Sequence, residues 1–171
     1  MTLGEWEKKG QRWISRILKG LQTVPASQKA LERLGEGPFS VELLCVQRGK
    51  SRQINFEHRG VDRETDVLSF PVPSRFAHPV MTLGSLVVCV PVMREQARVR
   101  KLDPEMEFVL LLVHGILHLL GWDHEQDVRE LREMAAVETA VLERVVPKGW
   151  VRETQGRCLL GLIERVQLDT D

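Results

Sequence analysis

The chain has few cysteines, no excess of either charge and no long apolar run, and each shortage excludes a class of protein. Three cysteines in 171 residues, widely spaced and without a CxxC pair, exclude a disulfide scaffold and favour reduced thiols in the core of a cytoplasmic protein. The 24 basic and 24 acidic residues give a formal net charge of zero, unlike a polybasic protein that coats nucleic acid or a membrane surface. The most apolar stretch, residues 108–122, is shorter than the roughly 20 residues that cross a bilayer. The first residues also lack the basic and apolar segments of an export signal, so we expect a cytoplasmic protein with no membrane contact.

The spacing of apolar residues predicts an α+β fold in one domain, since 171 residues suffice for one core. Helical spacing predicts about five helices, near residues 13–21, 26–34, 91–100, 104–120 and 127–146. A period of two predicts about four strands: a hairpin of residues 39–43 and 54–58 around a turn at 48–51, then buried strands at 67–70 and 83–90. Residues 147–171 form a C-terminal extension to which the sequence assigns no role.

The most informative segment is the histidine-rich stretch at residues 114–124. His114 and His118 are one helical turn apart, so their imidazoles lie on the same face and can converge on one ion. Gly121 permits a backbone conformation that ends the helix and lets His124 return as a third ligand. Three imidazoles leave one position of a tetrahedral ion open for water, as in catalytic zinc sites. We therefore expect one Zn²⁺ ion, with nickel, copper and iron as alternatives that imidazole also suits.

The histidine spacing equals that of the metzincin metallopeptidases except at the second position. Those enzymes carry a glutamate there as general base for the zinc-bound water, and this chain carries Gly115. A metzincin-like peptidase would need another carboxylate, Asp123 or Glu125, in that role. A metal can itself bring the pKa of bound water to about 7 and polarise a phosphoryl oxygen. The glycine therefore weakens the peptidase interpretation, and a hydrolase without that base would prefer a nearby cationic group to stabilise charge on its substrate.

Together with the histidine segment, residues 55–60, 65–71 and 83–84 resemble the YbeY family of bacterial metal-dependent endoribonucleases, with the motifs in the same order. The resemblance implies a zincin-like fold with a small mixed sheet and a metal held by His114, His118 and His124. It also implies cleavage of single-stranded RNA, maturation of the 3′ end of 16S rRNA and ribosome quality control. The small ribosomal subunit is then an expected partner.

The resemblance also assigns roles to individual residues around the metal. Arg59 matches the family's functional arginine and is expected after the second strand, where its planar guanidinium suits phosphate oxygens. Asp66 and Ser69 belong to a shared motif, and we expect them to cap a turn and hold a strand beside the metal. Asp123 adjoins His124 and either orients a ligand imidazole or acts on the bound water.

Two further positions bear on function. Ser85 stands where the family usually has an aspartate, which puts turnover in question more than metal binding. Glu138 falls on the apolar stripe of the last helix, and a buried acid needs a partner, either an arginine or a ligand histidine.

Three functions follow from these residues. The leading hypothesis is a metal-dependent endoribonuclease in which either water or the RNA's own 2′-hydroxyl attacks the phosphodiester. The second is the metzincin-like metallopeptidase. The third is a non-catalytic ribosome-assembly factor with a structural metal, which Ser85 favours.

A chain of zero net charge that handles RNA must sort its charges, because phosphate contacts dominate RNA affinity. Residues 48–63 and 94–101 are rich in arginine and lysine, and the acids gather in residues 125–143. We therefore predict a positive cleft beside the metal and a negative surface away from it.

Overall fold

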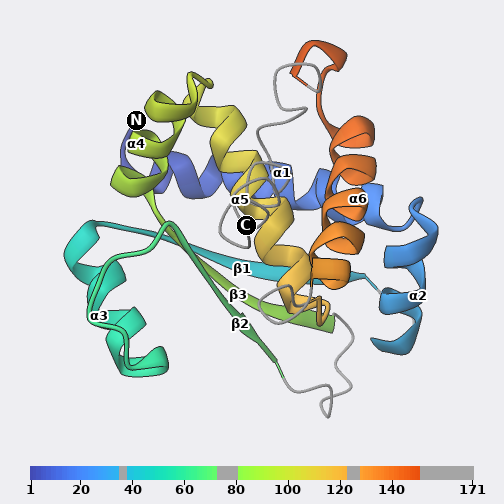
Figure 1. The fold of residues 1–171 in the computed structure, drawn as a ribbon, viewed down its shortest axis with the longest axis horizontal. Coiled ribbons are helices and arrows are strands. Elements are labelled where there is room, and N and C mark those ends of the chain that lie inside the picture. The colour runs from blue at the N-terminus through green and yellow to red at the C-terminus, as the bar shows by residue number, and fades with distance from the viewer. Residues whose placement is uncertain (35–37, 73–80, 123–127, 151–171) are drawn as a thin grey trace, which may run out of the picture.

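The computed structural model describes residues 1–34, 38–72, 81–122 and 128–150 of the chain, and these residues form an α+β fold (Figure 1). The helices are α1 (Leu3–Leu21), α2 (Pro25–Leu34), α3 (Arg48–Arg59), α4 (Val90–Arg100), α5 (Pro104–Leu119) and α6 (Val128–Val145). The strands are β1 (Phe39–Val46), β2 (Val67–Pro71) and β3 (Met81–Cys89). Within the described residues the sheet thus has three strands, one fewer than predicted, and six helices accompany it.

The strand order is β1-β3-β2, with β1 parallel and β2 antiparallel to the central strand. The register of β1 against β3 shifts between Ser40 and Val41, beside Gly84. Gly84 has φ +149°, and a Cβ atom there would overlap the carbonyl oxygen of Phe70 on β2. Only glycine adopts this backbone without strain and lets β2 approach so closely.

The predicted hairpin is wrong, because residues 48–59 form helix α3 and β1 pairs with β3. Ser51, Ile54 and Asn55 are the buried residues of α3, at helical spacing, while Phe56 is exposed. The alternation of Ile54, Phe56 and His58 therefore does not mark a strand with one buried face. Arg59 accordingly lies in the last turn of α3 and not after a second strand.

The buried polar side chains of α3 fix the chain that follows it. Ser51 Oγ donates to the carbonyl of Thr65 at 2.8 Å and accepts from its N–H at 3.1 Å. Asn55 Nδ2 donates to the carbonyl of Arg63 at 2.8 Å. Ile54 meanwhile packs with Val46, Leu68, Val87 and Cys89 in a small cluster on this face of the sheet. The sequence thus uses α3 to set the path of residues 60–66 into β2.

The other helix predictions are confirmed, except that α1 begins at Leu3, ten residues before the predicted stretch of 13–21. Pro91 occupies the first turn of α4, and Asp103 caps α5 by accepting from the N–H of Glu105 at 2.7 Å. Both placements follow from a proline's missing N–H group and an aspartate's affinity for unpaired helix donors.

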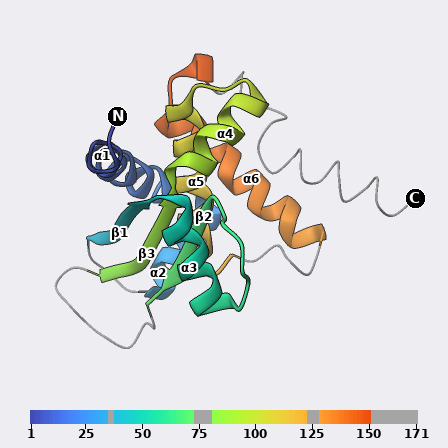
Figure 2. The ribbon, with the colours of Figure 1, turned by 90° about the vertical axis from the view of Figure 1, so that its left-hand side faces the viewer.

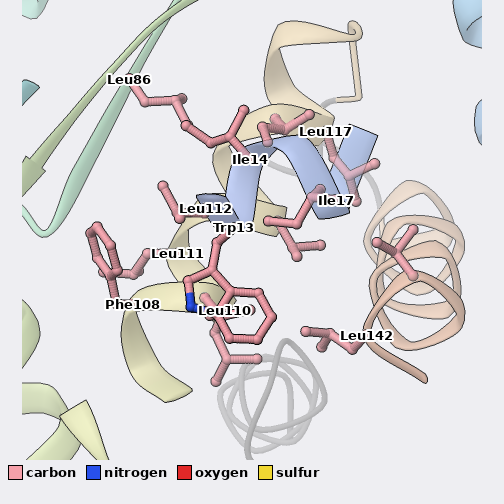
Figure 3. Packing of buried hydrophobic residues seen from close by; sticks show 14 of the residues in the cluster. Trp13, Ile14, Ile17, Leu86, Phe108, Leu110, Leu111, Leu112, Leu117 and Leu142 are labelled. Carbon is pink, nitrogen blue, oxygen red and sulfur yellow. The ribbon is translucent and has the colours of Figure 1, made fainter. Parts of the chain in front are cut away.

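Helix α5 is the centre of the main core. Its residues from Phe108 to Val113 are all buried, as a helix covered on every side requires. Figure 3 shows Phe108, Leu112 and Leu117 of α5 among Trp13 and Ile17 of α1. In the view of Figure 2, α1 and α6 lie on either side of α5 with the sheet below them. The core therefore holds α5 in a fixed position over β2 and β3.

The edge strand β1 is closed by a side chain of α1. The backbone N–H of Cys45 donates to Glu7 Oε1 at 2.9 Å. A carboxylate thus accepts from a backbone N–H of the edge strand that has no partner strand on that side. Cys45 and Cys89 are free and buried. Burial raises the pKa of the Cys45 thiol to about 12, which leaves it protonated and chemically inert as a core residue.

None of the helices in the described part of the chain combines the length and the apolar character that a bilayer span requires.

Candidate functional site

A cleft of about 630 Å³ opens where the C-terminal half of α5 meets β2 and the end of α3. Its lining combines two histidines, an arginine, an aspartate and hydroxyl groups with few large apolar side chains. The lining residues are Arg59, Thr65, Asp66, Val67, Ser69, Pro71, His114, His118, Gly121 and Trp122. Five of the seven residues that the sequence marked as site residues thus share one cleft.

His114 and His118 face each other across this cleft as their spacing predicts. Their Nε2 atoms are 3.1 Å apart, and their ring planes are inclined at 80°. Two nitrogen ligands at 2.0–2.1 Å from a tetrahedral zinc ion are about 3.3 Å apart. The two imidazoles are therefore already spaced as a pair of ligands to one such ion.

Glu138 of α6 lies beside the Nδ1 atom of His114. Its Oε1 lies 2.8 Å from His114 Nδ1, and Glu138 is buried. A carboxylate in this place accepts the Nδ1 proton and leaves the lone pair on Nε2, the nitrogen that faces His118. This is the arrangement of a metal-binding histidine with a supporting carboxylate. Among the described residues, His114 is therefore a partner of the kind that a buried Glu138 needs.

The end of α5 is built as Gly121 predicts. Gly121 has φ +88°, and its N–H donates to the carbonyl of His118 at 3.0 Å. The N–H of Trp122 then returns to the carbonyl of Leu117 at 3.0 Å. The chain turns sharply at this point, next to the histidine pair. His124 and Asp123, the predicted third ligand and its neighbour, lie outside the described residues.

Ser69 and Gly115 dock α5 onto the sheet. Ser69 Oγ donates to the carbonyl of Gly115 at 3.2 Å. A Cβ atom on Gly115 would lie 2.8 Å from Leu86 Cδ2 and 3.2 Å from Ser69 Oγ. Position 115 therefore faces β2 and β3 at close range, and the glutamate of a metzincin there would have to displace the side chain of Leu86.

Asp66 is held by three protein donors. Its Oδ1 accepts from the N–H of Val67 at 2.8 Å and from Thr65 Oγ1 at 3.1 Å. Its Oδ2 accepts from Gln96 Nε2 of α4 at 2.9 Å. The carboxylate thus fixes the start of β2 beside the cleft. Sequence reasoning missed Gln96, because a single glutamine on an amphipathic helix carries no distinguishing signal.

Arg59 carries the positive charge of the cleft. Arg52 is paired with Asp62 at 2.6 Å, and Arg48 is paired with Glu64 and Glu95. Across the described part of the chain no carboxylate lies within ion-pair distance of Arg59. Much of the basic run at residues 48–63 is therefore neutralised locally, and the guanidinium in the cleft keeps its charge for a ligand.

Ser85 points away from the histidines. Its neighbour Leu86 contacts α5, and adjacent strand residues face opposite sides of a sheet. Ser85 Oγ donates to Glu42 Oε2 of β1 at 2.8 Å on the other face. The replacement of the family's usual aspartate therefore changes the outer face of the sheet and leaves the histidine pair untouched.

Glu107 forms a second buried polar contact two turns before His114. Its Oε1 accepts from Arg100 Nη1 at 2.8 Å, and its side chain is fully buried. Burial raises the pKa of Glu107, Asp66 adds to the rise, and Arg100 offsets only part of it. The folded state therefore holds this proton more tightly than the unfolded chain does.

The raised pKa of Glu107 makes stability fall as pH rises. Below its ordinary pKa of 4.5, Glu107 does not lower the free energy of unfolding. As pH rises through the folded-state pKa, the loss of stability caused by Glu107 grows. We expect Glu107→Gln to gain stability over the parent chain between pH 4.5 and 7, measured by urea unfolding. Glu57→Gln on the surface is the control, and a gain that is equal at both ends of this range would contradict the prediction.

The cleft combines a histidine pair, a buried carboxylate behind it and an arginine with no carboxylate partner among the described residues, and is of the type found in enzymes that act on anionic substrates. The family described as Endoribonuclease YbeY matches residues 5–146. The chain belongs to this family.

Relatives named Endoribonuclease YbeY support the assignment. The protein of Acinetobacter baumannii is 38% identical over 133 residues, which cover 75% of this chain and 84% of the relative. That of Sulfurimonas denitrificans is 38% identical over 116 residues, 68% of this chain and 80% of the relative. The solution structure of TM1509 from Thermotoga maritima is similar with a TM-score of 0.47 and 28% identity, over 87% of this chain and 85% of that one.

Proposed function

We propose that this chain is a metal-dependent endoribonuclease that cleaves single-stranded RNA. The carrying observation is that one cleft contains both the histidine pair and an arginine with no carboxylate partner among the described residues. Family membership supports the nuclease activity, because the relatives are named for it. The proposal extends to the 3′ end of 16S rRNA as substrate, to ribosome quality control, to the small ribosomal subunit as partner and to the cytoplasm as location.

The metal part of the proposal assigns Zn²⁺ to His114, His118 and His124 in a zincin-like arrangement. The 3.1 Å separation of the two Nε2 atoms and the Glu138 contact support it. When bound, such an ion supplies Lewis acidity and lowers the pKa of a coordinated water to about 7.

The protein's own residues position the RNA. Arg59 holds phosphoryl oxygens of the substrate with its planar donors and stays charged at every physiological pH. Glu138 accepts a hydrogen bond from the Nδ1–H group of His114, so the lone pair on Nε2 stays directed into the cleft. Asp66 fixes the start of β2 against α4, Ser69 fixes β2 against α5, and neither needs to react. Asp123 is proposed to orient His124.

The two alternatives differ in what supports them. A metzincin-like peptidase is disfavoured, because a side chain at position 115 would meet Leu86 and Ser69. The hypothesis of a non-catalytic assembly factor with a structural metal was favoured by Ser85. That support is removed, because Ser85 faces away from the histidines. Metal-site variants that still support rRNA processing in cells would favour this assembly factor over the nuclease.

The experiment is RNA cleavage by the full chain, stripped of metal and then reloaded with zinc. We expect cleavage of a single-stranded oligoribonucleotide to stop on chelation and return with zinc. Arg59→Gln should lower the rate about 100-fold or more, the size of effect found on removing one donor that stabilises charge in a transition state. Its bound zinc per chain should be unchanged.

The outcome that would contradict the proposal is undiminished cleavage after complete metal removal. Product ends decide the attacking group, because a 2′,3′-cyclic phosphate excludes direct attack by water.

A further inference from the structure

Phe56 is an aromatic side chain that the fold leaves in solvent. It is 58% exposed, and the other large apolar side chains exposed in the described part of the chain are aliphatic. The aromatic rings of Trp6 and Phe108 pack on each other in the core, and Phe70 packs on His58. Burying a phenyl ring stabilises a protein substantially. The exposed ring of Phe56 therefore contributes little to the fold.

The position of Phe56 relates it to the cleft. It precedes Arg59 by three residues in the last turn of α3, so the two side chains share one side of the helix with Cβ atoms about 5–6 Å apart. Gly60, with φ +70°, ends the helix and donates its N–H to the carbonyl of Phe56 at 3.0 Å. The ring thus stands on the same fixed helix end as Arg59, which lines the cleft.

The charges around the ring leave one side open to an anion. Arg52, one turn before Phe56, is held by Asp62 through two contacts of 2.6 Å. Glu57 accepts from Gln53 at 2.7 Å, on the flank of the helix. The guanidinium of Arg59 has no such carboxylate among the described residues. An exposed ring beside an unneutralised guanidinium matches a ligand with a flat apolar part and a phosphate.

We propose that Phe56 is a stacking platform for one base of the RNA strand whose phosphate Arg59 holds. The inference rests on the proposed function and adds a binding subsite to it. A single strand offers unstacked bases, and an aromatic ring stacks on any of them without reading the sequence. A base and the backbone phosphate of its own nucleotide are close enough for one to touch Phe56 and the other Arg59 in the last turn of α3. The site therefore selects single-stranded over double-stranded RNA.

The test measures binding of a fluorescein-labelled oligouridylate to the full-length chain in chelator, by fluorescence anisotropy. Phe56→Ala should raise the Kd about 5- to 150-fold, the range that removal of one stacking ring produces. Phe56→Trp should bind as tightly as the parent chain. Val99→Ala removes a comparably exposed apolar side chain, 72% exposed on α4, and should leave the Kd unchanged.

An abasic oligonucleotide of the same length separates stacking from charge. Phe56→Ala and the parent chain should bind it equally, because it carries no base to stack. Arg59→Gln should weaken binding of both oligonucleotides and reduce the slope of log K against log salt by about 0.7, the value for one phosphate contact on a single strand.

Two results would overturn the inference. One is an unchanged Kd of Phe56→Ala for the oligouridylate, and the other is a loss of affinity for the abasic strand equal to that for the oligouridylate. In the first case the ring is a contact for a protein partner or has no ligand. Either result can occur while the parent chain still cleaves RNA, so failure of the subsite is distinguishable from failure of the proposed nuclease activity.

Discussion

His114→Ala is expected to lower RNA cleavage by more than about 100-fold. Loss of the carboxylate behind a ligand histidine already costs 10–100-fold in metal affinity or activity, and removing the ligand itself removes more. The imidazole is lost from a pair whose Nε2 atoms are 3.1 Å apart, so His118 alone cannot replace it. The measurements are the cleavage rate and the zinc bound per chain, with circular dichroism to check the fold.

Glu138→Gln is a milder variant of the same site. Its amide oxygen can still accept the Nδ1 proton, so its affinity for zinc should fall less, and excess zinc should restore its cleavage rate. His58→Ala removes a histidine of α3 that packs on Phe70 and should leave bound zinc unchanged. Normal zinc content and full cleavage in His114→Ala would refute the assignment of this histidine as a ligand.

Gly84→Ala is expected to destabilise the fold by about 3 kcal/mol or more. A non-glycine residue at φ +149° is strained by about 1–3 kcal/mol. Overpacking adds about 1–3 kcal/mol, because the new Cβ would overlap the carbonyl oxygen of Phe70 and lie 2.9 Å from Leu119 Cδ2. Neither backbone atoms of β2 nor the core helix can move away cheaply. The free energy of unfolding in urea measures the effect.

Gly49→Ala is the matched control for this substitution. Gly49 lies in the first turn of α3, and nothing is within 4 Å of a Cβ built there. Alanine is favoured over glycine in a helix, so this variant should be as stable as the parent or up to about 1 kcal/mol more stable. A loss of stability equal to that of Gly84→Ala would show that the strain argument is wrong.

Sequence alone predicted the local geometry around the histidines better than the sheet. The turn at Gly121 and the shared face of His114 and His118 follow from helical geometry over a few residues, which the sequence encodes locally. Glu138 and His114 are 24 residues apart on different helices. The sequence indicated only that this acid needs a partner. The geometry of such a pair depends on packing.

The failure at residues 48–59 has an equally physical cause. Ile54, Phe56 and His58 alternate with polar residues, but only Ile54 is buried, and it shares one buried helical face with Ser51 and Asn55. A stretch this short fits both periods, so tertiary contacts decide between them. The parallel pairing of β1 with β3 is a long-range choice that no local pattern specifies. The same misreading placed Arg59 after a strand, and the family resemblance alone marked it as a site residue.

The contact between Glu7 and the N–H of Cys45 also bears on how copies of this chain behave at high concentration. An edge strand with free donors is a template on which a second chain can add its own strand. The carboxylate of α1 fills one such donor on β1 and brings negative charge to that edge. An incoming strand would have to displace this charge together with the helix that carries it. The first helix thus protects the sheet against aggregation as well as completing the core.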